Sequence, residues 1–278
     1  MLKKIKAMKK AAAMLAFAMA FGFGVNMNSA LAAEGAGGET LSVGANMENP
    51  QTAKDYWERG SFKAVKKDYD GAIADYNEAL KLVPGFVAAL NNRGNCYIAK
   101  GEYDKAIADF TEAVKIDPNY GDAYYNMGNA YTEKQDLDKA VEAYNNCIKA
   151  EPKHIDAWFN LATCKADQGK LDECEAAFKE ILKIDADYLD ANFMLGTLYT
   201  RQKKFDLALE QYETITKKYR QYYEAFYMKG AVLEELGRKE EAVAAYKEFL
   251  YLVPAELNDH YAEVIKSAKD SIKELEAK

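Results

Sequence analysis

The chain's two histidines, His154 and His260, are the first candidates for acid–base chemistry or for metal binding. General acid–base and nucleophilic catalysis need a partner group within hydrogen-bond reach. The spacing around neither histidine suggests such a partner. The glycines recur at a long fixed step and do not gather in one phosphate-binding loop. We therefore expect no catalytic residue and no enzymatic activity.

The four cysteines, Cys96, Cys147, Cys164 and Cys174, are the second candidates. Each stands where other copies of the repeat described below carry a small or apolar residue, which favours buried thiols acting as small hydrophobic side chains. A disulfide is the alternative, because an exported protein can form one. Cys164 and Cys174 are the expected pair, since they would lie on the two helices of one repeat. No spacing suggests a metal site, and we expect neither metal nor cofactor.

These residues are positioned by a repeat of 34 residues, which dominates the sequence. Residues 87–120 are repeated by 121–154, and the same columns continue in both directions to give six copies over 53–256. In each copy, apolar residues recur at steps of three and four on both sides of a turn, which predicts two packed helices. The columns are Gly60, Gly94, Gly128, Ala162, Gly196 and Gly230; Ala72, Ala106, Ala140, Cys174, Ala208 and Ala242; and Tyr76, Phe110, Tyr144, Phe178, Tyr212 and Tyr246.

The repeat resembles the tetratricopeptide-repeat (TPR) family over most of the chain. The resemblance implies an all-α TPR solenoid, a right-handed superhelix of six helix-turn-helix repeats. The expected repeats are 53–86, 87–120, 121–154, 155–188, 189–222 and 223–256. After them, apolar residues recur on one helical face over 257–278, which predicts a capping helix. These residues are Leu257, Tyr261, Val264, Ala268, Ile272 and Leu275. An oligomer contact is the alternative role for that face.

Residues 1–32 predict a bacterial export signal. Five lysines precede an apolar run over 11–25, which is short for a membrane span. Residues 30–32, Ala-Leu-Ala, fit a small-residue cleavage site, so we expect cleavage before Ala33 and a periplasmic or extracellular protein. An uncleaved membrane anchor is the alternative. Residues 33–52, rich in Gly, Glu, Asn and Ala, predict a flexible linker.

Loss of the signal makes an acidic chain more acidic. Residues 1–32 hold five lysines and no acidic residue, so their removal takes the formal net charge from −7 to −12. A protein of this charge repels nucleic acid and anionic lipid at long range. We therefore expect no nucleic-acid partner, and no stable membrane insertion after cleavage.

One face of the first helix in each repeat lies beside the packing face. By resemblance to the TPR family, this face lines a concave groove that binds peptides. Aromatic rings are typical interface anchors, and asparagine amides can both donate to and accept from a peptide backbone. Packing of some of these rings against the neighbouring repeat is the alternative. The expected groove residues are Trp57, Asn91, Asn92, Asn95, Tyr125, Asn126, Asn129, Phe159, Asn160, Thr163, Phe193 and Tyr227.

An acidic column, Asp122, Asp156, Asp190 and Glu224, stands at the start of successive first helices. Favourable interaction with the helix dipole is the preferred explanation. An acidic rim that prefers basic or neutral partners is the other, and both can hold. Some TPR domains bind a peptide's terminal carboxylates with Lys and Arg in the groove. This chain carries Trp, Asn, Tyr and Asp there, so we do not expect a chaperone-tail partner.

The sequence thus predicts a non-catalytic exported adaptor or scaffold that binds a protein or peptide in its groove, within a cell-envelope assembly. The partner's identity stays open, and the chain is expected to be a monomer or a weak homo-oligomer. Two alternatives remain. One is a self-associating structural subunit of the envelope, and the other is an accessory protein that presents a small ligand to a transporter.

Overall fold

The computed structural model describes residues 48–257 and 259–277, and the structural statements below concern these residues. They form thirteen α-helices and one short 3-10 helix, with no β-strand among them. The predicted all-α TPR architecture is therefore confirmed. The predicted export signal and most of the predicted linker lie outside the described residues.

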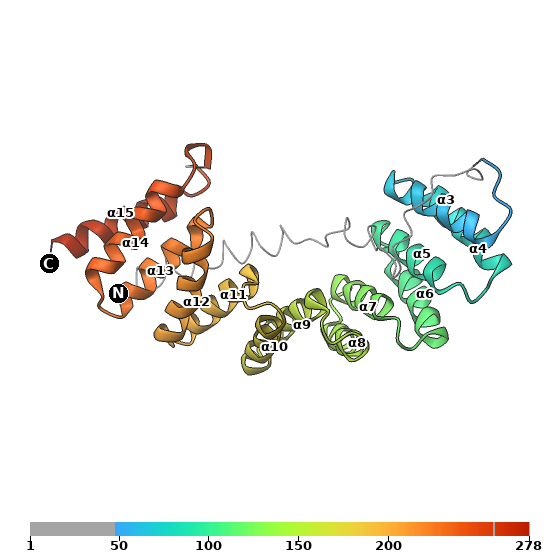
Figure 1. Ribbon diagram of the computed structural model, residues 1–278, viewed down its shortest axis with the longest axis horizontal. Helices are drawn as coiled ribbons and strands as arrows, with labels where there is room; N and C mark the ends of the chain where they lie inside the picture. Colours follow the sequence, from blue (N-terminus) through green and yellow to red (C-terminus); the bar gives the residue numbers. More distant parts are fainter. Residues whose placement is uncertain (1–47, 258, 278) are drawn as a thin grey trace. The chain divides into compact units, whose positions relative to one another are not determined.

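The chain divides into two compact units, with the boundary between Lys170 and Leu171. Each unit is described by itself (Figure 1). The N-terminal unit, residues 48–170, contains α3 (Ala53–Val65), α4 (Tyr69–Leu82), α5 (Val87–Ala99), α6 (Tyr103–Ile116), α7 (Gly121–Glu133), α8 (Leu137–Ala150) and α9 (Ile155–Asp167). The C-terminal unit contains α10 (Leu171–Ile184), α11 (Leu189–Arg201), α12 (Phe205–Lys218), α13 (Tyr223–Glu235), α14 (Lys239–Leu252), η1 (Ala255–Leu257) and α15 (Ala262–Glu276).

The helices follow the 34-residue step of the sequence. From α3 to α14 they alternate between 13 and 14 residues, and within each unit every α-helix packs against the next. The turn inside each pair contains one residue with a positive φ angle. These residues are Lys67, Gly101, Gln135, Gly169, Lys203 and Gly237, with φ between 61° and 75°. Glycine adopts this conformation without strain, which is why it supplies three of the six turns.

In five of the six repeats, a glycine on the first helix packs against an aromatic ring on the second. A Cβ atom added to Gly94 would lie 2.5 Å from Cε1 of Phe110, and one added to Gly128 would lie 2.5 Å from Cε1 of Tyr144. Both rings are fully buried among alanines that follow the same columns. The small residues therefore set the separation of the paired helices, and the aromatic ring fills the space beside them.

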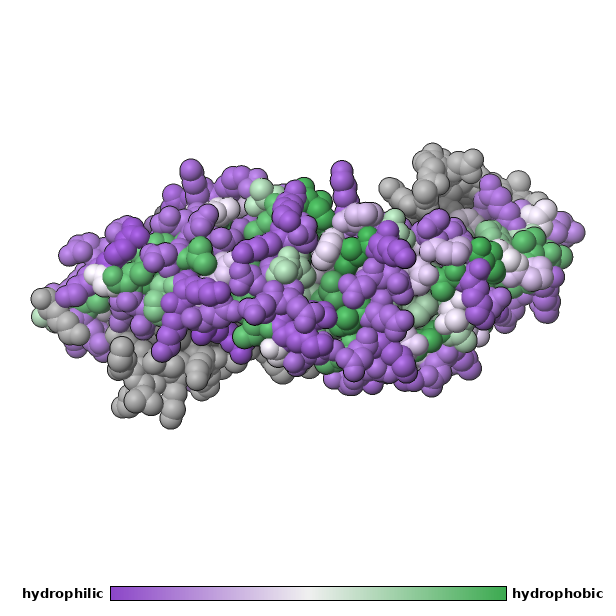
Figure 2. All heavy atoms as spheres, turned by 90° about the horizontal axis from the view of Figure 1, so that it is seen from below, coloured by the Kyte–Doolittle hydropathy of each residue, from purple (hydrophilic) through white to green (hydrophobic). Residues whose placement is uncertain are grey.

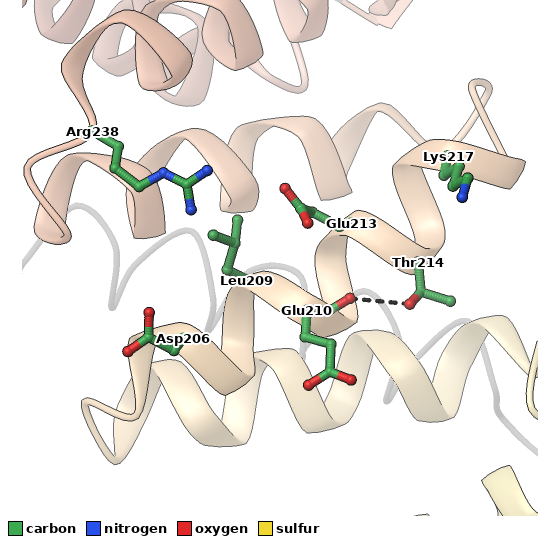
Figure 3. Close-up of a pocket in the computed structure, with 7 residues that line it drawn as sticks. All are labelled: Asp206, Leu209, Glu210, Glu213, Thr214, Lys217 and Arg238. Atoms are coloured by element: carbon green, nitrogen blue, oxygen red, sulfur yellow. Dashed lines mark hydrogen bonds between the residues drawn. The ribbon is translucent and has the colours of Figure 1, made fainter.

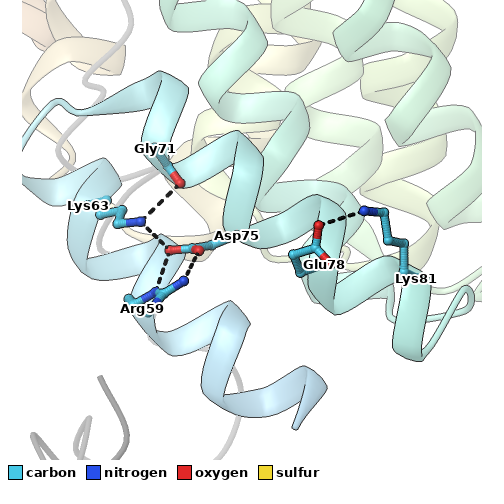
Figure 4. A network of polar contacts seen from close by, with 6 residues as sticks. All are labelled: Arg59, Lys63, Gly71, Asp75, Glu78 and Lys81. Atoms are coloured by element: carbon cyan, nitrogen blue, oxygen red, sulfur yellow. Dashed lines mark hydrogen bonds and ion pairs between the residues drawn. The ribbon is translucent and has the colours of Figure 1, made fainter. Parts of the chain in front are cut away.

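The first two repeats also contain buried ion pairs. Asp75 accepts hydrogen bonds from Nε of Arg59 at 2.9 Å and from Nη2 at 2.6 Å, and Nζ of Lys63 lies 2.7 Å from the same carboxylate (Figure 4). In the second repeat, Arg93 binds Asp109 in the same bidentate way, at 2.8 and 2.6 Å. Each pair joins the first helix of a repeat to the second. Bidentate geometry makes these pairs stronger than ordinary surface ion pairs.

We expect the Asp75 pair to make stability depend on pH. Burial alone would raise the pKa of Asp75, but hydrogen bonds and charge from Arg59 and Lys63 outweigh it and lower that pKa. The carboxylate therefore stabilises the folded state above the ordinary aspartate pKa of about 3.9, and this contribution is lost as pH falls through the lowered folded pKa. Wild type and Asp75→Asn should be compared by urea denaturation at pH 7, 5 and 3. The wild-type advantage should be full at pH 7 and 5 and should shrink at pH 3, whereas a constant difference would contradict this account.

The C-terminal helix begins later than the sequence predicted. α15 starts at Ala262, and not at Leu257, because η1 and a polar turn that includes Asp259 precede it. Aspartate favours turns over helix interiors. Tyr261 therefore stands before the helix, where its hydroxyl donates to Glu224 at 2.6 Å. α15 packs against α14 and so covers the last repeat.

None of the helices in the described part of the chain is both long and apolar enough to span a membrane. Figure 2 shows hydrophilic residues over much of one face of the molecule, with hydrophobic residues in separate patches between them.

Candidate functional site

The predicted groove residues of the N-terminal unit lie on one face formed by α3, α5, α7 and α9. We call this face the amide face. Its residues are Trp57, Ser61, Asn91, Asn92, Asn95, Tyr125, Asn126, Asn129, Phe159, Asn160 and Thr163. Hydrogen bonds between the first helices of successive repeats link many of these residues, so the face is continuous along the unit. Three of its aromatic rings, those of Trp57, Tyr125 and Phe159, are partly exposed.

Tyrosines of two second helices donate hydrogen bonds to residues of the amide face. The Tyr76 hydroxyl donates to Oγ of Ser61 at 3.1 Å, and Nδ2 of Asn92 in the next repeat donates to the same oxygen at 3.3 Å. Ser61 stands in the same column as the predicted groove residues Asn95 and Asn129, but its role as an acceptor from tyrosine was not predicted. The presence of tyrosine at some positions of the aromatic column and phenylalanine at others was the sequence signal that could have indicated a hydroxyl donor beside Ser61.

The third repeat contains the same arrangement with asparagine in place of serine. The Tyr144 hydroxyl donates to Oδ1 of Asn129 at 2.8 Å, and Nδ2 of Asn160 in the next repeat donates to that oxygen at 3.0 Å. Nδ2 of Asn160 also lies 3.5 Å from the Tyr125 hydroxyl. Burial, together with the negative charge of Asp156, raises the pKa of Tyr125, so its hydroxyl stays protonated at neutral pH. These hydrogen bonds fix the positions of the three side chains.

The remaining asparagines of the amide face are buried. Nδ2 of Asn126 donates to Oδ1 of Asn91 at 3.0 Å, which joins α7 to α5. Asn95 is also buried, and its Nδ2 has no hydrogen-bond partner. The amides were predicted to face a peptide as one set, but Asn92, Asn126 and Asn160 donate hydrogen bonds to the preceding repeat. Asn92, Asn160 and Thr163 are the polar members of the predicted set with accessible surface.

The two predicted groove rings of the C-terminal unit lie in the core, which corrects the expectation for them. Phe193 is 2% exposed and contacts Tyr212 and Tyr222, with ring centroids 5.7 and 5.3 Å apart. Tyr227 is 3% exposed, and its hydroxyl donates to Oγ of Ser267 at 3.1 Å. Both rings are buried because other groups shield them from solvent: the ring of Tyr222 packs on Phe193, and α15 packs on Tyr227. The packing alternative therefore holds for both.

In the N-terminal unit, rings from the turns between repeats also contact the aromatic residues of the amide face. Phe86 contacts Trp57 at a centroid distance of 5.9 Å, and His154 contacts Tyr125 at 4.8 Å. Nδ1 of His154 also accepts a hydrogen bond from the backbone N–H of Ala157 at 3.2 Å, which caps α9. His154 therefore has a structural role in this unit. Trp57 beside Phe86, and Tyr125 beside His154, stay partly exposed.

The acidic column lies in the first turns of α7, α9, α11 and α13, as helix-dipole complementarity requires. Asp156 is exposed and Asp122 partly so. Burial raises the pKa of Asp190, and Glu224 accepts the Tyr261 hydroxyl. Asp122 and Asp156 are therefore the residues of the column that could act as an acidic rim beside the amide face.

The four cysteines are buried thiols in the structure. Burial raises the pKa of Cys96 to about 12 and that of Cys147 to about 12, so these thiols are poor nucleophiles at neutral pH. Cys164 and Cys174 are not bonded to each other in the structure, and they belong to different units. The disulfide between them stays a prediction. Within the described ranges, no group of three or more His, Cys, Asp or Glu side chains could hold a metal ion.

A separate hollow lies on the C-terminal unit (Figure 3). It is lined by Asp206, Leu209, Glu210, Glu213, Thr214, Lys217 and Arg238. Most of its charged groups lie on α12, and several have partners: Glu213 pairs with Lys229 at 3.3 Å, and Arg238 binds Glu241 at 2.7 Å. The hollow offers a single apolar side chain, Leu209, and it contains none of the predicted groove residues.

Comparison with known proteins agrees with the fold. A family model described as TPR repeat matches residues 94–134. A model described as tetratricopeptide repeat matches 66–108 and 132–193, and a second model with that description matches 193–256. Together these matches cover 66–256 without a gap, which is more than half of the 278 residues. No curated protein matches the chain.

Solved structures give the same result. The crystal structure of MamA protein is 28% identical with a TM-score of 0.53, and the match covers 60% of this chain and 94% of that one. YrrB, described as a TPR protein with an unusual peptide-binding site, is 18% identical with a TM-score of 0.58, covering 70% and 97%. PilF of Pseudomonas aeruginosa is 14% identical with a TM-score of 0.59, covering 81% and 96%. The last two likenesses show the fold alone.

Proposed function

Because the chain belongs to the tetratricopeptide-repeat family, we propose that it is a non-catalytic adaptor or scaffold that binds a protein or peptide on its amide face. The observation that carries the proposal is the contrast between the two units. Trp57, Tyr125 and Phe159 keep accessible ring surface in the N-terminal unit, whereas Phe193 and Tyr227 are buried in the C-terminal unit. Partly exposed aromatic rings beside polar groups are typical of binding anchors.

The amide face suits a neutral or basic extended segment. It carries no lysine or arginine, and Asp122 and Asp156 lie beside it at the starts of α7 and α9. With the export signal removed, the formal net charge of −12 adds long-range attraction for basic partners. The export signal further supports a role outside the cytoplasm, in a cell-envelope assembly.

Selection from a phage-displayed library of random linear peptides tests this function. Residues 33–278 serve as bait, and each selected peptide is then synthesised and measured by isothermal titration calorimetry. The proposal expects peptides that bind with micromolar affinity and that are neutral or basic in net charge. Recovery of no binding peptide, or of strongly acidic peptides alone, would contradict it.

Self-association is a second candidate, which the exposed apolar residues of α3 favour. Phe62 is 41% exposed and Val65 is 60% exposed. The residues equivalent to Phe62 in the following repeats, Cys96, Ala130, Cys164, Leu198 and Val232, are all buried. α3 is the first helix of the described part of the chain, and its exposed apolar side chains offer a surface to a second copy of the chain.

We expect sedimentation to decide whether α3 supports self-association. If the chain forms a dimer through this edge, Phe62→Lys with Val65→Lys should convert it to a monomer at tens of micromolar. Leu207→Lys on α12 removes a side chain that is 42% exposed and should leave the dimer intact. A monomeric wild type at the same concentration would remove this candidate.

A further inference from the structure

An aspartate recurs in the first turn of the second helix in successive repeats. This aspartate column consists of Asp70, Asp104, Asp138, Asp172 and Asp206. Nζ of Lys100, at the end of α5, donates to Asp70 at 2.5 Å, and Lys134 pairs with Asp104 in the same way. Nε2 of Gln168 donates to Asp138 at 2.9 Å. In the N-terminal unit, the first helix of the next repeat therefore supplies a donor to each aspartate of the column.

The two aspartates of the C-terminal unit lack this bond. Gln202 takes the lysine's position relative to Asp172, and Leu236 takes it relative to Asp206. Leucine has no donor, and Asp206 forms no hydrogen bond or ion pair within the part of the chain that the structure describes. Asp206 therefore keeps a carboxylate that a lysine neutralises at the equivalent positions of the N-terminal unit.

α12 adds two more carboxylates beside Asp206. Asp206, Glu210 and Glu213 stand at steps of four and three, so they lie on one face of α12, and all three line the hollow of Figure 3. None of the other second helices carries acidic residues at all three positions. Glu213 is paired with Lys229 at 3.3 Å, whereas Glu210 has no side-chain partner among the described residues. Like charges four residues apart repel each other, so Asp206 and Glu210 favour a cation between them.

The two cations that line the hollow do not supply that charge. Nε and Nη2 of Arg238 each donate to Glu241 at 2.7 Å, so the charge of Arg238 reaches Asp206 only at longer range. Lys217 stands roughly 16 Å further along α12 than Asp206. The end of the hollow beside Asp206 is therefore negatively charged, and the apolar side chain of Leu209 forms part of its wall.

We propose that this hollow binds a lysine side chain of a protein partner, with the ammonium group between Asp206 and Glu210. Lysine fits because the aspartate column already binds ammonium groups in the second and third repeats. The lysine stem can lie on Leu209, since lysine buries its methylene groups on apolar surface while its charged end stays among polar groups. The hollow has a volume of about 450 Å³, within the range of binding pockets. It contains no residue of the amide face, so it gives the scaffold a second binding surface.

Two short peptides test the assignment. The probe is the pentapeptide Gly-Leu-Lys-Leu-Gly, acetylated and amidated at its ends, and its control carries norleucine in place of lysine. Backbone amide resonances of ¹⁵N-labelled residues 33–278 are followed during both titrations. The lysine peptide should shift the amides around Asp206 and Glu210 until saturation, and the norleucine peptide should leave them unchanged.

Two variants of the hollow should bind the probe about fivefold more weakly, the range of an exposed ion pair. Asp206→Asn with Glu210→Gln removes both unpaired charges. Leu236→Lys supplies a lysine from the chain itself, which should pair with Asp206 and exclude the probe. The matched control, Asp138→Asn with Glu142→Gln, removes the same charges from the equivalent positions of α8 and should bind the probe as wild type does.

The contrary outcomes are distinct. Equal binding of the lysine and norleucine peptides, or wild-type affinity in Asp206→Asn with Glu210→Gln, would overturn the proposal. An equal loss in the α8 control would show that the charge of the whole chain attracts the probe, and would overturn it as well. Butylamine that binds as tightly as the lysine peptide would assign the hollow to free amines and overturn the protein partner. If Leu236→Lys does not fold, the substitutions at Asp206 and Glu210, which are exposed, decide.

Discussion

Replacing Gly94 with leucine should destabilise the chain by about 1–3 kcal/mol, the usual cost of overpacking a close-packed interface. A Cβ atom at this position would lie 2.5 Å from Cε1 of Phe110, 2.8 Å from Cζ and 3.1 Å from Cδ1. The ring cannot move aside, since Phe110 is fully buried in a cluster with Ala106 and Ala113. The added side chain must therefore separate α5 from α6.

Gly85 provides the matched control for this substitution. It lies in the turn between α4 and α5, and a Cβ atom there would meet nothing within 4 Å. Leucine at Gly85 should leave the melting temperature near wild type, because neither packing nor backbone conformation resists it. Thermal denaturation followed by circular dichroism measures both variants. Equal melting temperatures for the two would show that the glycine column does not set the helix separation.

The Phe159→Ala variant should bind a selected peptide about tenfold to thirtyfold more weakly than wild type, which is the usual loss of affinity when an aromatic anchor is removed. Phe159 on α9 is partly exposed on the amide face. Tyr125 is not chosen, because it packs against the cluster of Tyr144, Leu161 and Cys164 and its truncation would lower stability. The expected change is in affinity, with the melting temperature reduced only slightly.

Tyr251→Ala controls for the loss of an aromatic ring as such. Tyr251 is 80% exposed on α14 of the C-terminal unit and is not one of the residues of the amide face. Titration calorimetry with one selected peptide should give wild-type affinity for this variant. A Phe159→Ala variant that binds as tightly as Tyr251→Ala would place the binding surface elsewhere.

The helices could be predicted because the packing repeats. Each repeat contacts its neighbours through the same columns, so Gly94, Phe110 and their equivalents define two helices without knowledge of the rest of the chain. The start of α15 could not be predicted in the same way. Leu257 and Tyr261 continue the apolar spacing of that helix, yet η1 and a turn precede it, and spacing alone does not distinguish these conformations.

The site was only partly predictable, because exposure depends on contacts between repeats. Trp57 and Phe193 occupy equivalent columns, but Phe193 is closed off by Tyr222, whereas Trp57 beside Phe86 keeps accessible surface. The spacing within a helix contains no information about that coverage. The spacing likewise does not reveal that Nδ2 of Asn95 is buried without a hydrogen-bond partner.

The most direct test of the central claim is to locate a bound peptide by the side-chain amide resonances of the asparagines. Wild-type residues 33–278, labelled with ¹⁵N, are titrated with one selected peptide. The account predicts shifts for Asn92, Asn95 and Asn160 on the amide face, and none for Asn145, which is exposed on the second helix α8. Shifts at Asn145 with none on the amide face would contradict it.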